Sequence, residues 1–578
     1  MNSGSDDRSS TPARGILPGL VSGRLRWDAL DPFPERTPEE RAADEKTLAD
    51  IAVFHERRVD PEELDRTRTL PEGFLDDLQR QGYLRLGVGP DLGGLGLTSY
   101  AVFEAVARTA QWSVPAAQIM AIQAGVGAPA MLPALPEGPL RTHVRRRISE
   151  GTVSGFGDTD HAGQNNSRPA LTATPTPDGS AYELTGDKLF IGNGPVADLL
   201  PVSAVLDDPD RQRVGVCFVD TRSPGFEVTS RIDFMGSRGL PNGALRLEKV
   251  RVPREHVLVE GDGDRLPAAI GFLGLVGRLH FTGAPALAVA RNCAEWSRDF
   301  VVRRTVDGRP LGDYEQIQRL VATTVAEVYA MESVARLSLV GAGLGDRWLE
   351  QFLAKNVLVR TAGRIADRTV SLLGAEGLET VASKRRRGAP DLPVERAYRD
   401  ARGLRIAGNV DFQLDNQGAQ LLLAAFHRDP DTGRTEPPSD LGLSTAADAH
   451  LTDANRAHVA ALARHTADLA RICRELTDGH EDLTGLYEHE GTLVLVARIA
   501  ADLLTMSAAL ARASHLTRTG ADDNAQALAD LYCAGARHRL DAARRRLAAV
   551  RSGAEPDFAA ISRAWLSVPG RDREAPLR

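Results

Sequence analysis

The spacing of apolar residues changes twice along the chain. Between Ser154 and Pro253 apolar residues alternate with polar ones, and the segments 182–191, 214–219 and 244–252 are separated by clusters of Gly, Pro, Asp and Asn. Alternation of this kind predicts short β-strands joined by turns. Before and after this block apolar residues recur every three or four positions, which predicts helices. We therefore expect a mainly α-helical protein with a small central β-barrel domain.

The same pattern divides the chain into successive parts. A chain of 578 residues is too long for one ordinary domain. Its first 45 residues are polar without a sustained period, so we expect a mobile leader there. A run rich in Pro and Asp near residue 430 predicts a linker. The expected parts are a leader at 1–45, an N-terminal helical domain at 46–152, a β-barrel domain at 153–265, a helical bundle at 266–427, a linker at 428–445, an extra helical domain at 446–566 and a tail at 567–578.

Composition narrows the class of protein. An apolar content of 42% and a charged content of 26% are typical of a soluble globular protein. No segment approaches the roughly 20 uninterrupted apolar residues of a membrane span, and the first 14 residues lack the apolar core of a signal peptide, so we expect a cytoplasmic protein. The four scattered cysteines predict neither a zinc site nor disulfides. A net charge of -8 argues against a nucleic-acid binder.

Three phrases in the β block carry the first clue to chemistry. They are Asp158-Thr-Asp-His-Ala-Gly-Gln-Asn-Asn166, Gly186-Asp-Lys-Leu-Phe-Ile-Gly-Asn-Gly194 and Met235-Gly-Ser-Arg-Gly239. In order and spacing they resemble the acyl-CoA dehydrogenase family, in which such phrases form the wall that holds the isoalloxazine of FAD. The resemblance implies FAD contacts at Phe156, Thr159, Phe190 and Gly192. At Gly192 the family has a hydroxyl near the flavin, which this chain lacks.

The helical part after the β block resembles the C-terminal bundle of the same family. Its phrases are Arg304-Thr-Val-Asp-Gly308, Tyr314-Glu-Gln-Ile-Gln318 and Ser371-Leu-Leu-Gly-Ala-Glu-Gly377. The resemblance implies that Arg304, Gln318, Gly374 and Gly377 contact the FAD phosphates and adenine, the arginine often those of a neighbouring subunit. A homodimer or tetramer is therefore expected, and a partner subunit is an alternative. Asp307 and Ser371 depart from the family pattern.

The last third of the chain resembles the extra C-terminal helical domain of the very-long-chain branch of this family. The resemblance rests on the segments 491–514 and 530–533. Within this region His458–Leu476 has apolar residues on one face and could be either a surface anchor for a membrane or an ordinary packed helix. Its polar face carries charges of both signs, which favours the packed helix.

The residue that the family needs for catalysis is absent. The resemblance implies a glutamate that removes a proton from the acyl α-carbon, and Gly408 stands at its position. The other position that the family uses is occupied by Gly277, directly before Arg278. Glycine cannot accept a proton, so neither position supplies a base. Asp411 and His280 are weak replacement candidates, because such residues are more often a helix cap and a hydrogen-bonded core residue.

Three functions remain open. The first is a divergent flavoprotein that binds FAD and acts on an acyl thioester carried by CoA or an acyl carrier protein, with α,β-oxidation if another base exists. The second is a member of the fold that works without FAD or serves as a non-catalytic subunit. The third is a flavin-dependent monooxygenase, which needs no glutamate. Retained flavin bands in the absorption spectrum would distinguish the first and third from the second.

Overall fold

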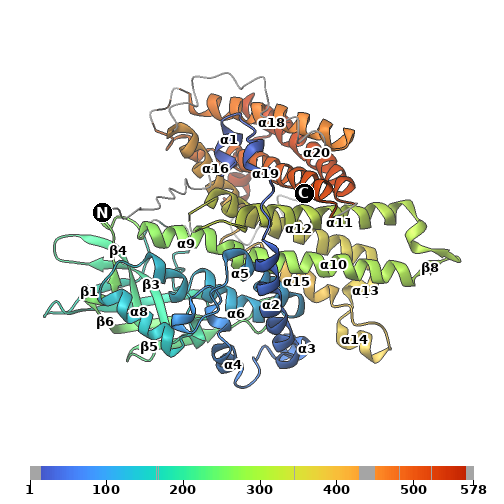
Figure 1. The fold of residues 1–578 in the computed structure, drawn as a ribbon. Helices are drawn as coiled ribbons and strands as arrows, with labels where there is room; N and C mark the ends of the chain where they lie inside the picture. The colour runs from blue at the N-terminus through green and yellow to red at the C-terminus, as the bar shows by residue number, and fades with distance from the viewer. Residues whose placement is uncertain are drawn as a thin grey trace, which may run out of the picture.

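A computed structural model describes residues 15–567 except 164, 165, 167, 344, 429–449, 479, 481, 522 and 523. The described chain is mostly helical, with one sheet at one end and a helical layer stacked on the central bundle (Figure 1). The expected linker at 428–445 and the tail at 567–578 lie almost wholly outside the described residues. The fold class predicted from the pattern is confirmed, apart from the shape of the sheet.

The N-terminal helices pack in front of the sheet and beside the bundle. Thr37 begins α2 with a capping box, its side chain accepting from the Glu40 backbone N–H while the Glu40 carboxylate accepts from the Thr37 N–H. Helices α5 and α6 are almost fully buried and form the inner layer. The elements are α1 (Leu17–Val21), α2 (Pro38–Arg58), α3 (Pro61–Thr67), α4 (Phe74–Arg80), α5 (Ser99–Trp112), α6 (Val114–Gly125), α7 (Ala128–Met131) and α8 (Pro139–Glu150).

The β domain is one open seven-stranded sheet with the order β5-β6-β2-β1-β3-β4-β7. The expectation of a barrel was wrong in this respect, because the short edge strands β5 and β7 do not pair with each other. Most neighbours are antiparallel, and only β1 and β3 run parallel. The strands are β1 (Thr172–Pro175), β2 (Ala181–Gly192), β3 (Leu199–Asp207), β4 (Gln212–Asp220), β5 (Phe226–Arg231), β6 (Asn242–Pro253) and β7 (Val257–Leu258).

The bundle carries the site through an irregularity in its first long helix. Helix α9 ends at Arg278, five residues form a π-helical turn (Leu279–Gly283), and α10 continues from Ala284. Such turns inside α-helices are frequent at functional sites. The elements are α9 (Ala268–Arg278), α10 (Ala284–Arg303), β8 (Thr305–Val306), β9 (Arg309–Pro310), α11 (Glu315–Leu339), α12 (Trp348–Leu373), α13 (Ala375–Leu378), α14 (Val381–Arg386), α15 (Val394–Leu404) and α16 (Asp411–Arg428).

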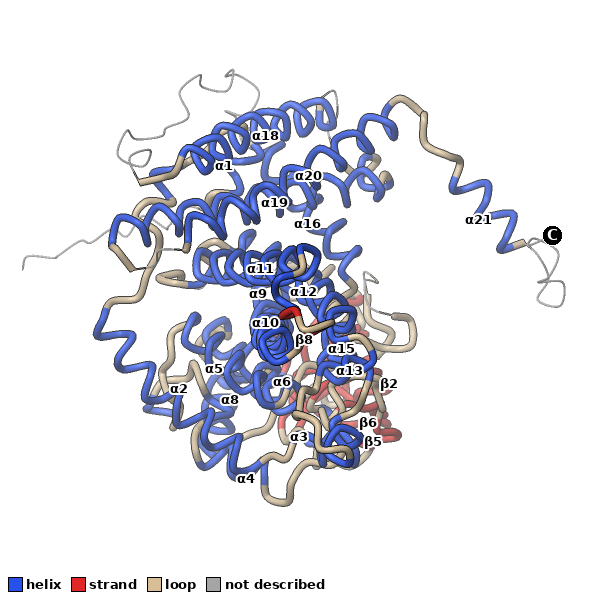
Figure 2. The backbone as a smooth tube through the Cα atoms, turned by 90° about the vertical axis from the view of Figure 1, so that its right-hand side faces the viewer, coloured by secondary structure: helices blue, strands red, loops and turns tan. Residues whose placement is uncertain are grey.

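The C-terminal helices stack on the bundle and share its hydrophobic core. They are α18 (Asp453–Thr477), α19 (Glu490–Thr519), α20 (Ala525–Arg551) and α21 (Phe558–Leu566). Helix α19 is long and apolar enough to cross a membrane, but 78% of its most apolar window is buried inside the protein, so it is the core helix of this layer. In α18 the residues Val459, Leu462, Leu469 and Ile472 are buried, which confirms a packed helix. Helix α21 projects away from the body (Figure 2).

The expectation of a leader at 1–45 was wrong for residues 15–45. Leu17, Leu20, Trp27 and Leu30 are each at most 1% exposed and belong to the main core. Helix α1 lies against α16, α18 and α19, which come from the last third of the sequence (Figure 2). The apolar residues of this segment are buried although polar residues surround them in the sequence, because burial removes their apolar surface from water. The segment is too short for their spacing to predict a helix.

Candidate active site

Gly408 lies against the side chain of Arg278. The glycine sits in the loop between α15 and α16 with φ +67°, a conformation that glycine adopts without strain. A Cβ atom at Gly408 would lie 3.2 Å from Cγ of Arg278. The structure therefore brings together two of the residues that the sequence singled out. The aliphatic part of Arg278 lies where the side chain of any other residue at 408 would begin.

Gly277 cannot carry a side chain in this fold. A Cβ atom there would lie 2.3 Å from the backbone oxygen of Gly125, at the end of α6, and 2.9 Å from its carbonyl carbon. The contact is reciprocal, since a Cβ at Gly125 would lie 2.9 Å from the oxygen of Gly277. The two glycines let α6 and α9 approach at backbone distance. A glutamate at the second family position is thus excluded by packing as well as by sequence.

Arg278 has no partner among the residues that the structure describes. It makes no side-chain hydrogen bond or ion pair there, and its Nη1 atom is buried. Burial lowers the pKa of Arg278 to about 10, and the nearby charge of Asp158 opposes the shift without closing to an ion pair. At neutral pH the guanidinium is charged and uncompensated, which is unusual for a largely buried arginine.

A second cation that sequence reasoning missed lies beside the same loop. Lys355, in the middle of α12, is 0% exposed, and its Nζ donates to the backbone oxygen of Asn409 at 3.1 Å. Burial, followed by the charge of Arg278, lowers the pKa of Lys355 to about 7. A lysine inside the apolar run Phe352-Leu-Ala-Lys-Asn-Val-Leu-Val359 was the available signal, because lysine is rarely buried without a specific role.

Neither weak candidate is free to act as a base. The Nε2 atom of His280 lies 3.0 Å from the Ser99 backbone oxygen and 3.2 Å from its hydroxyl, and burial lowers the histidine pKa. Burial alone would raise the pKa of Asp411, but Arg405 outweighs it with bonds of 2.9 and 2.6 Å to one carboxylate oxygen and lowers the pKa. The other oxygen accepts from the Phe412 N–H. His280 is a core residue and Asp411 is a structural ion-pair partner.

The β domain presents an exposed apolar wall where the flavin ring is expected. Phe190 is 52% exposed, and its ring lies 6.2 Å from that of Phe234. Behind it Gly192 lies close to α6, since a Cβ atom there would be 2.6 Å from Cδ1 of Ile122. Two exposed aromatic rings fit the face of a planar cofactor. The predicted wall residue Phe190 is thus placed where a flavin could cover it.

The other residues predicted for this wall support it from within. The backbone oxygen of Thr159 accepts from the N–H of Leu189, which aligns the 158–160 segment with β2. Phe156 is partly buried in the cluster that joins the sheet to α7 and α8. Oδ1 of Asp158 accepts the Ser203 hydroxyl at 2.8 Å, so its charge is held inside the domain.

The residues predicted for the phosphates and adenine do not meet this wall within one chain. Arg304, Gln318, Gly374 and Gly377 cluster around β8 and α13, at the end of the bundle opposite the sheet (Figure 1). Arg304 is exposed, and its Nη1 is 4.0 Å from a carboxylate oxygen of Glu376.

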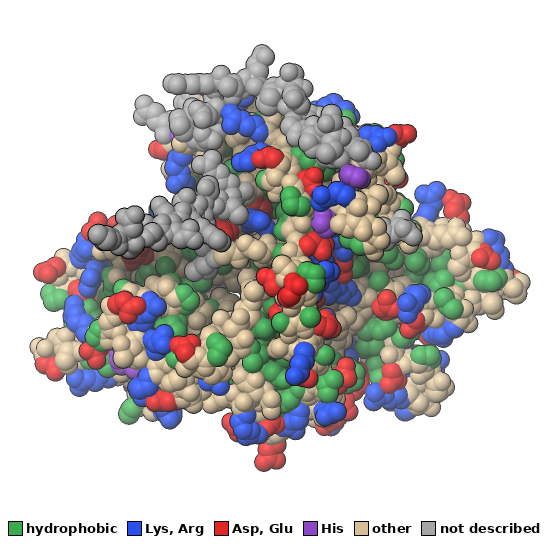
Figure 3. Space-filling model, in the orientation of Figure 1, with side chains coloured by type: hydrophobic (Ala, Val, Ile, Leu, Met, Phe, Trp, Pro, Cys, Tyr) green, Lys and Arg blue, Asp and Glu red, His purple; other side chains and the backbone are tan. Residues whose placement is uncertain are grey.

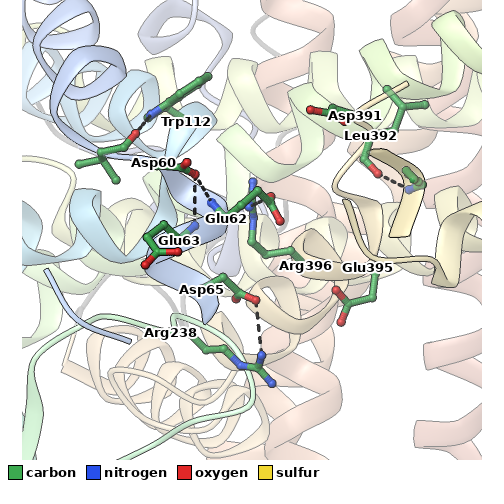
Figure 4. A network of polar contacts seen from close by, with 12 residues as sticks. Asp60, Glu62, Glu63, Asp65, Trp112, Arg238, Asp391, Leu392, Glu395 and Arg396 are labelled. Atoms are coloured by element: carbon green, nitrogen blue, oxygen red, sulfur yellow. Dashed lines mark hydrogen bonds and ion pairs between the residues drawn. The ribbon is translucent and has the colours of Figure 1, made fainter. Parts of the chain in front are cut away.

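A network of charges fixes the approach to Gly408. Asp65 of α3 accepts from Arg399 of α15 at 3.0 and 2.9 Å and from Arg238 at 3.4 Å. Glu62 of α3 pairs with Arg396, again of α15 (Figure 4). Helix α15 is therefore anchored to the N-terminal helices and to the 235–239 loop, which holds the loop carrying Gly408 in place.

Comparison with known proteins places these features in one family. The models of the acyl-CoA dehydrogenase middle domain and C-terminal domain match residues 156–250 and 275–422. The probable acyl-CoA dehydrogenase FadE10 of Mycobacterium tuberculosis is 29% identical over 556 residues, which cover 90% of this chain and 84% of the relative. The mitochondrial very long-chain specific acyl-CoA dehydrogenase of Mus musculus is 26% identical over 68% of this chain and 60% of its own length.

Solved structures show the same fold. An acyl-CoA dehydrogenase from Bacillus anthracis, complexed with FAD, covers 95% of this chain and 94% of its own with a TM-score of 0.74 at 18% identity. Butyryl-CoA dehydrogenase of Megasphaera elsdenii covers 66% of this chain and 98% of its own with a TM-score of 0.58 at 22% identity. The helical layer beyond the bundle thus has a counterpart in some members of the fold only. Members of the family bind FAD and act on acyl-CoA thioesters. This chain carries the middle and C-terminal domains of the acyl-CoA dehydrogenase family.

Proposed function

We propose that the protein is a flavoprotein that binds an acyl thioester but has no carboxylate base of its own for α,β-dehydrogenation. The observation that carries the proposal is the pair of blocked positions. Gly408 faces the stem of Arg278, and Gly277 is pressed against the backbone of Gly125. His280 and Asp411 are both held by other partners. No described side chain replaces the carboxylate.

The remaining residues suit binding. The exposed rings of Phe190 and Phe234 fit one face of FAD, which when bound would supply a two-electron acceptor. Arg278 lies directly before the π-helical turn, and the charge of Asp158 in the β domain reaches it. The chain's own residues would therefore hold and orient a thioester, while the first chemical step lacks the family's carboxylate as proton acceptor.

Two other functions were open from the sequence. In a protein without FAD nothing would cover the exposed ring of Phe190, so its exposure supports the flavoprotein. A flavin-dependent monooxygenase needs no α-proton acceptor and remains the alternative among enzymes. Oxygen uptake by the reduced protein in the presence of an acyl thioester would support it.

The test is the flavin spectrum. The purified protein is incubated with FAD, separated from free FAD by gel filtration, and mixed under anaerobic conditions with acyl-CoA esters of increasing length. We expect flavin bands that persist and do not bleach, because no proton can be removed from the acyl α-carbon. Bleaching of the unmodified protein at the rates usual for enzymes would overturn the proposal. A colourless protein would favour the FAD-independent alternative.

A gain-of-function variant makes the test sharper. Gly408→Glu restores a carboxylate at the family position, beside Arg278, and is expected to make bleaching appear. The positive φ at 408 and the contact with Arg278 will cost about 1 kcal/mol or more of stability. Gly403→Glu is the matched control, because a Cβ at Gly403 meets no atom within 4 Å. It adds the same charge nearby and is expected to leave the spectrum unchanged.

We also propose that two copies of the chain assemble so that Arg304 and Gly374 of one reach the Phe190 wall of the other. The separation of the two halves of the FAD site within one chain supports this. The exposed apolar residues Val302 (80%) and Leu378 (68%) flank the arginine end. On the face in Figure 3 apolar side chains also gather near this end. Sedimentation equilibrium should give a dimer or larger, and Arg304→Gln should lower FAD retention without separating the copies.

A further inference from the structure

The site contains two cations and no anion that pairs with either of them. Arg278 makes no ion pair with a described residue, and among these residues the Lys355 ammonium donates to the backbone oxygen of Asn409. Burial, followed by the charge of Arg278, lowers the pKa of Lys355, so the two cations are close enough to interact. Both lie beside Gly408 and Asn409, the part of the loop that has no side-chain carboxylate.

The carboxylates nearest to this pair are engaged elsewhere. Asp411 is bonded to Arg405. Asp415 accepts from Asn356 at 2.8 Å, Arg360 at 3.2 Å and Arg498 at 2.8 Å. Asp158 is bonded to Ser203. Arg278 and Lys355 thus form no ion pair with these carboxylates, and Asp158, whose charge reaches Arg278, is held by Ser203 inside the β domain.

A guanidinium with a buried nitrogen and no ion pair is costly, because it loses hydration that the nearby charge of Asp158 offsets only in part. Lys355 can relieve the cost by losing its proton near neutral pH, but arginine stays protonated in proteins. The planar fork of arginine matches the two oxygens of a carboxylate. A ligand carboxylate is the group that would compensate Arg278 most directly.

We propose that the site selects acyl thioesters whose acyl group carries a second carboxylate, and that Arg278 binds this carboxylate. The inference rests on the proposed function in that it takes an acyl thioester as the ligand. It goes beyond it in naming the class of acyl group. Arg278 then acts as a specificity residue, and the missing glutamate makes room for the negative charge of the ligand.

The experiment compares pairs of thioesters that differ only by a methyl group against a carboxylate. Succinyl-CoA is paired with butyryl-CoA, and methylmalonyl-CoA with isobutyryl-CoA. Dissociation constants are measured by titration calorimetry on the FAD-loaded full-length protein. We expect the carboxylated member of at least one pair to bind roughly tenfold more tightly or better, the usual effect of a charge-assisted hydrogen bond.

Variants identify the residue responsible. Arg278→Met should abolish the preference, and Arg278→Lys should keep part of it because the charge remains. Gly408→Glu places a carboxylate of the chain beside Arg278 and should also abolish the preference. If Arg278→Met does not fold, as judged by circular dichroism and its melting temperature, Gly408→Glu carries the test with the arginine intact.

Each outcome decides the question. Equal binding within both pairs, or a preference that survives in both Arg278→Met and Gly408→Glu, overturns the inference and leaves the proposed function standing. If free succinate displaces butyryl-CoA as effectively as succinyl-CoA displaces it, the site binds any soluble carboxylate. That result also overturns the inference. Failure of all four thioesters to bind would refute the proposed function together with the inference.

Discussion

The backbone contact between Gly125 and Gly277 predicts that the smallest possible side chain at 277 is harmful. In Gly277→Ala the new methyl group would lie 2.3 Å from the Gly125 oxygen. An ordinary carbon–oxygen contact is about 3.3 Å or more, so α6 and α9 must separate by roughly 1 Å. Overpacking of this kind costs about 1–3 kcal/mol and sometimes more. Because the obstacle is backbone, no rotamer change can relieve it.

A matched control lies one turn earlier on the same helix. A Cβ at Gly274 meets no atom within 4 Å. Gly274→Ala should therefore gain about 1 kcal/mol from the better helix propensity of alanine. The same gain is included in Gly277→Ala, where the clash outweighs it. Because the gain is common to both, the two substitutions should differ by the cost of the clash, about 1–3 kcal/mol in stability.

The assay is the apparent melting temperature of the FAD-loaded protein and of both variants, followed by calorimetry at one scan rate. A chain of this size does not unfold in one step, so no free energy of unfolding is fitted. The three proteins are compared by the order of their melting temperatures. We expect Gly274→Ala to melt at or above the unmodified protein and Gly277→Ala several degrees below it. Equal melting of the two variants would refute the argument that packing closes this position.

Three further predictions concern other parts of the fold. Leu20→Ala should cost about 2–5 kcal/mol, because Leu20 is fully buried, whereas Val53→Ala at an exposed site should change the melting temperature little. The pKa of Lys355 is about 7 in the folded protein and near 10.5 in the unfolded chain, so the unfolded state binds more protons between these values. As pH rises from 7 to 9.5, the stability of the unmodified protein should therefore increase by up to about 3 kcal/mol relative to Lys355→Met. Melting temperatures of the two proteins that change in parallel across this range would contradict the prediction. His143 stacks on His256 at 3.8 Å, and burial followed by the charges of His256 and Arg147 lowers its pKa to about 4. Stability should therefore fall as pH drops from 6.5 towards 4, and less steeply in His143→Gln, as melting temperatures at each pH would show.

The absence of the catalytic glutamate was readable from the sequence because it depends on residue type alone. Gly277 and Gly408 cannot act as bases whatever their surroundings. What excludes a replacement depends on neighbours far along the chain, since Gly125 meets Gly277 and Ser99 holds His280. Such contacts leave no trace in local spacing. The sequence therefore predicted that the usual base is missing, and only the structure closes the alternatives.

Patterns also misled where they were short. The apolar residues at 17–30 are too few to reveal a period, so a segment with a buried tryptophan was expected to be mobile. The strands were recognised because alternation over a few residues is enough to define them. The alternation does not show whether the sheet closes into a barrel, because closure depends on whether the edge strands β5 and β7 pair. These strands have only six and two residues. Lys355 was overlooked because a single charge in an apolar helix does not disturb the period.

The position of α1 has a consequence for the order in which the protein can be completed during synthesis. The N–H of Leu17 donates to the Glu350 carboxylate at 2.8 Å, and α1 packs on α18 and α19. The packing of α1 is therefore completed only when residue 519 has been made, about 25–100 s after α1 itself at usual elongation rates. During most of that interval α1 can meet at most α16 among its partner helices α16, α18 and α19, so some of its apolar side chains stay uncovered. They form a segment that a chaperone can bind, and its release would signal that the last domain has folded.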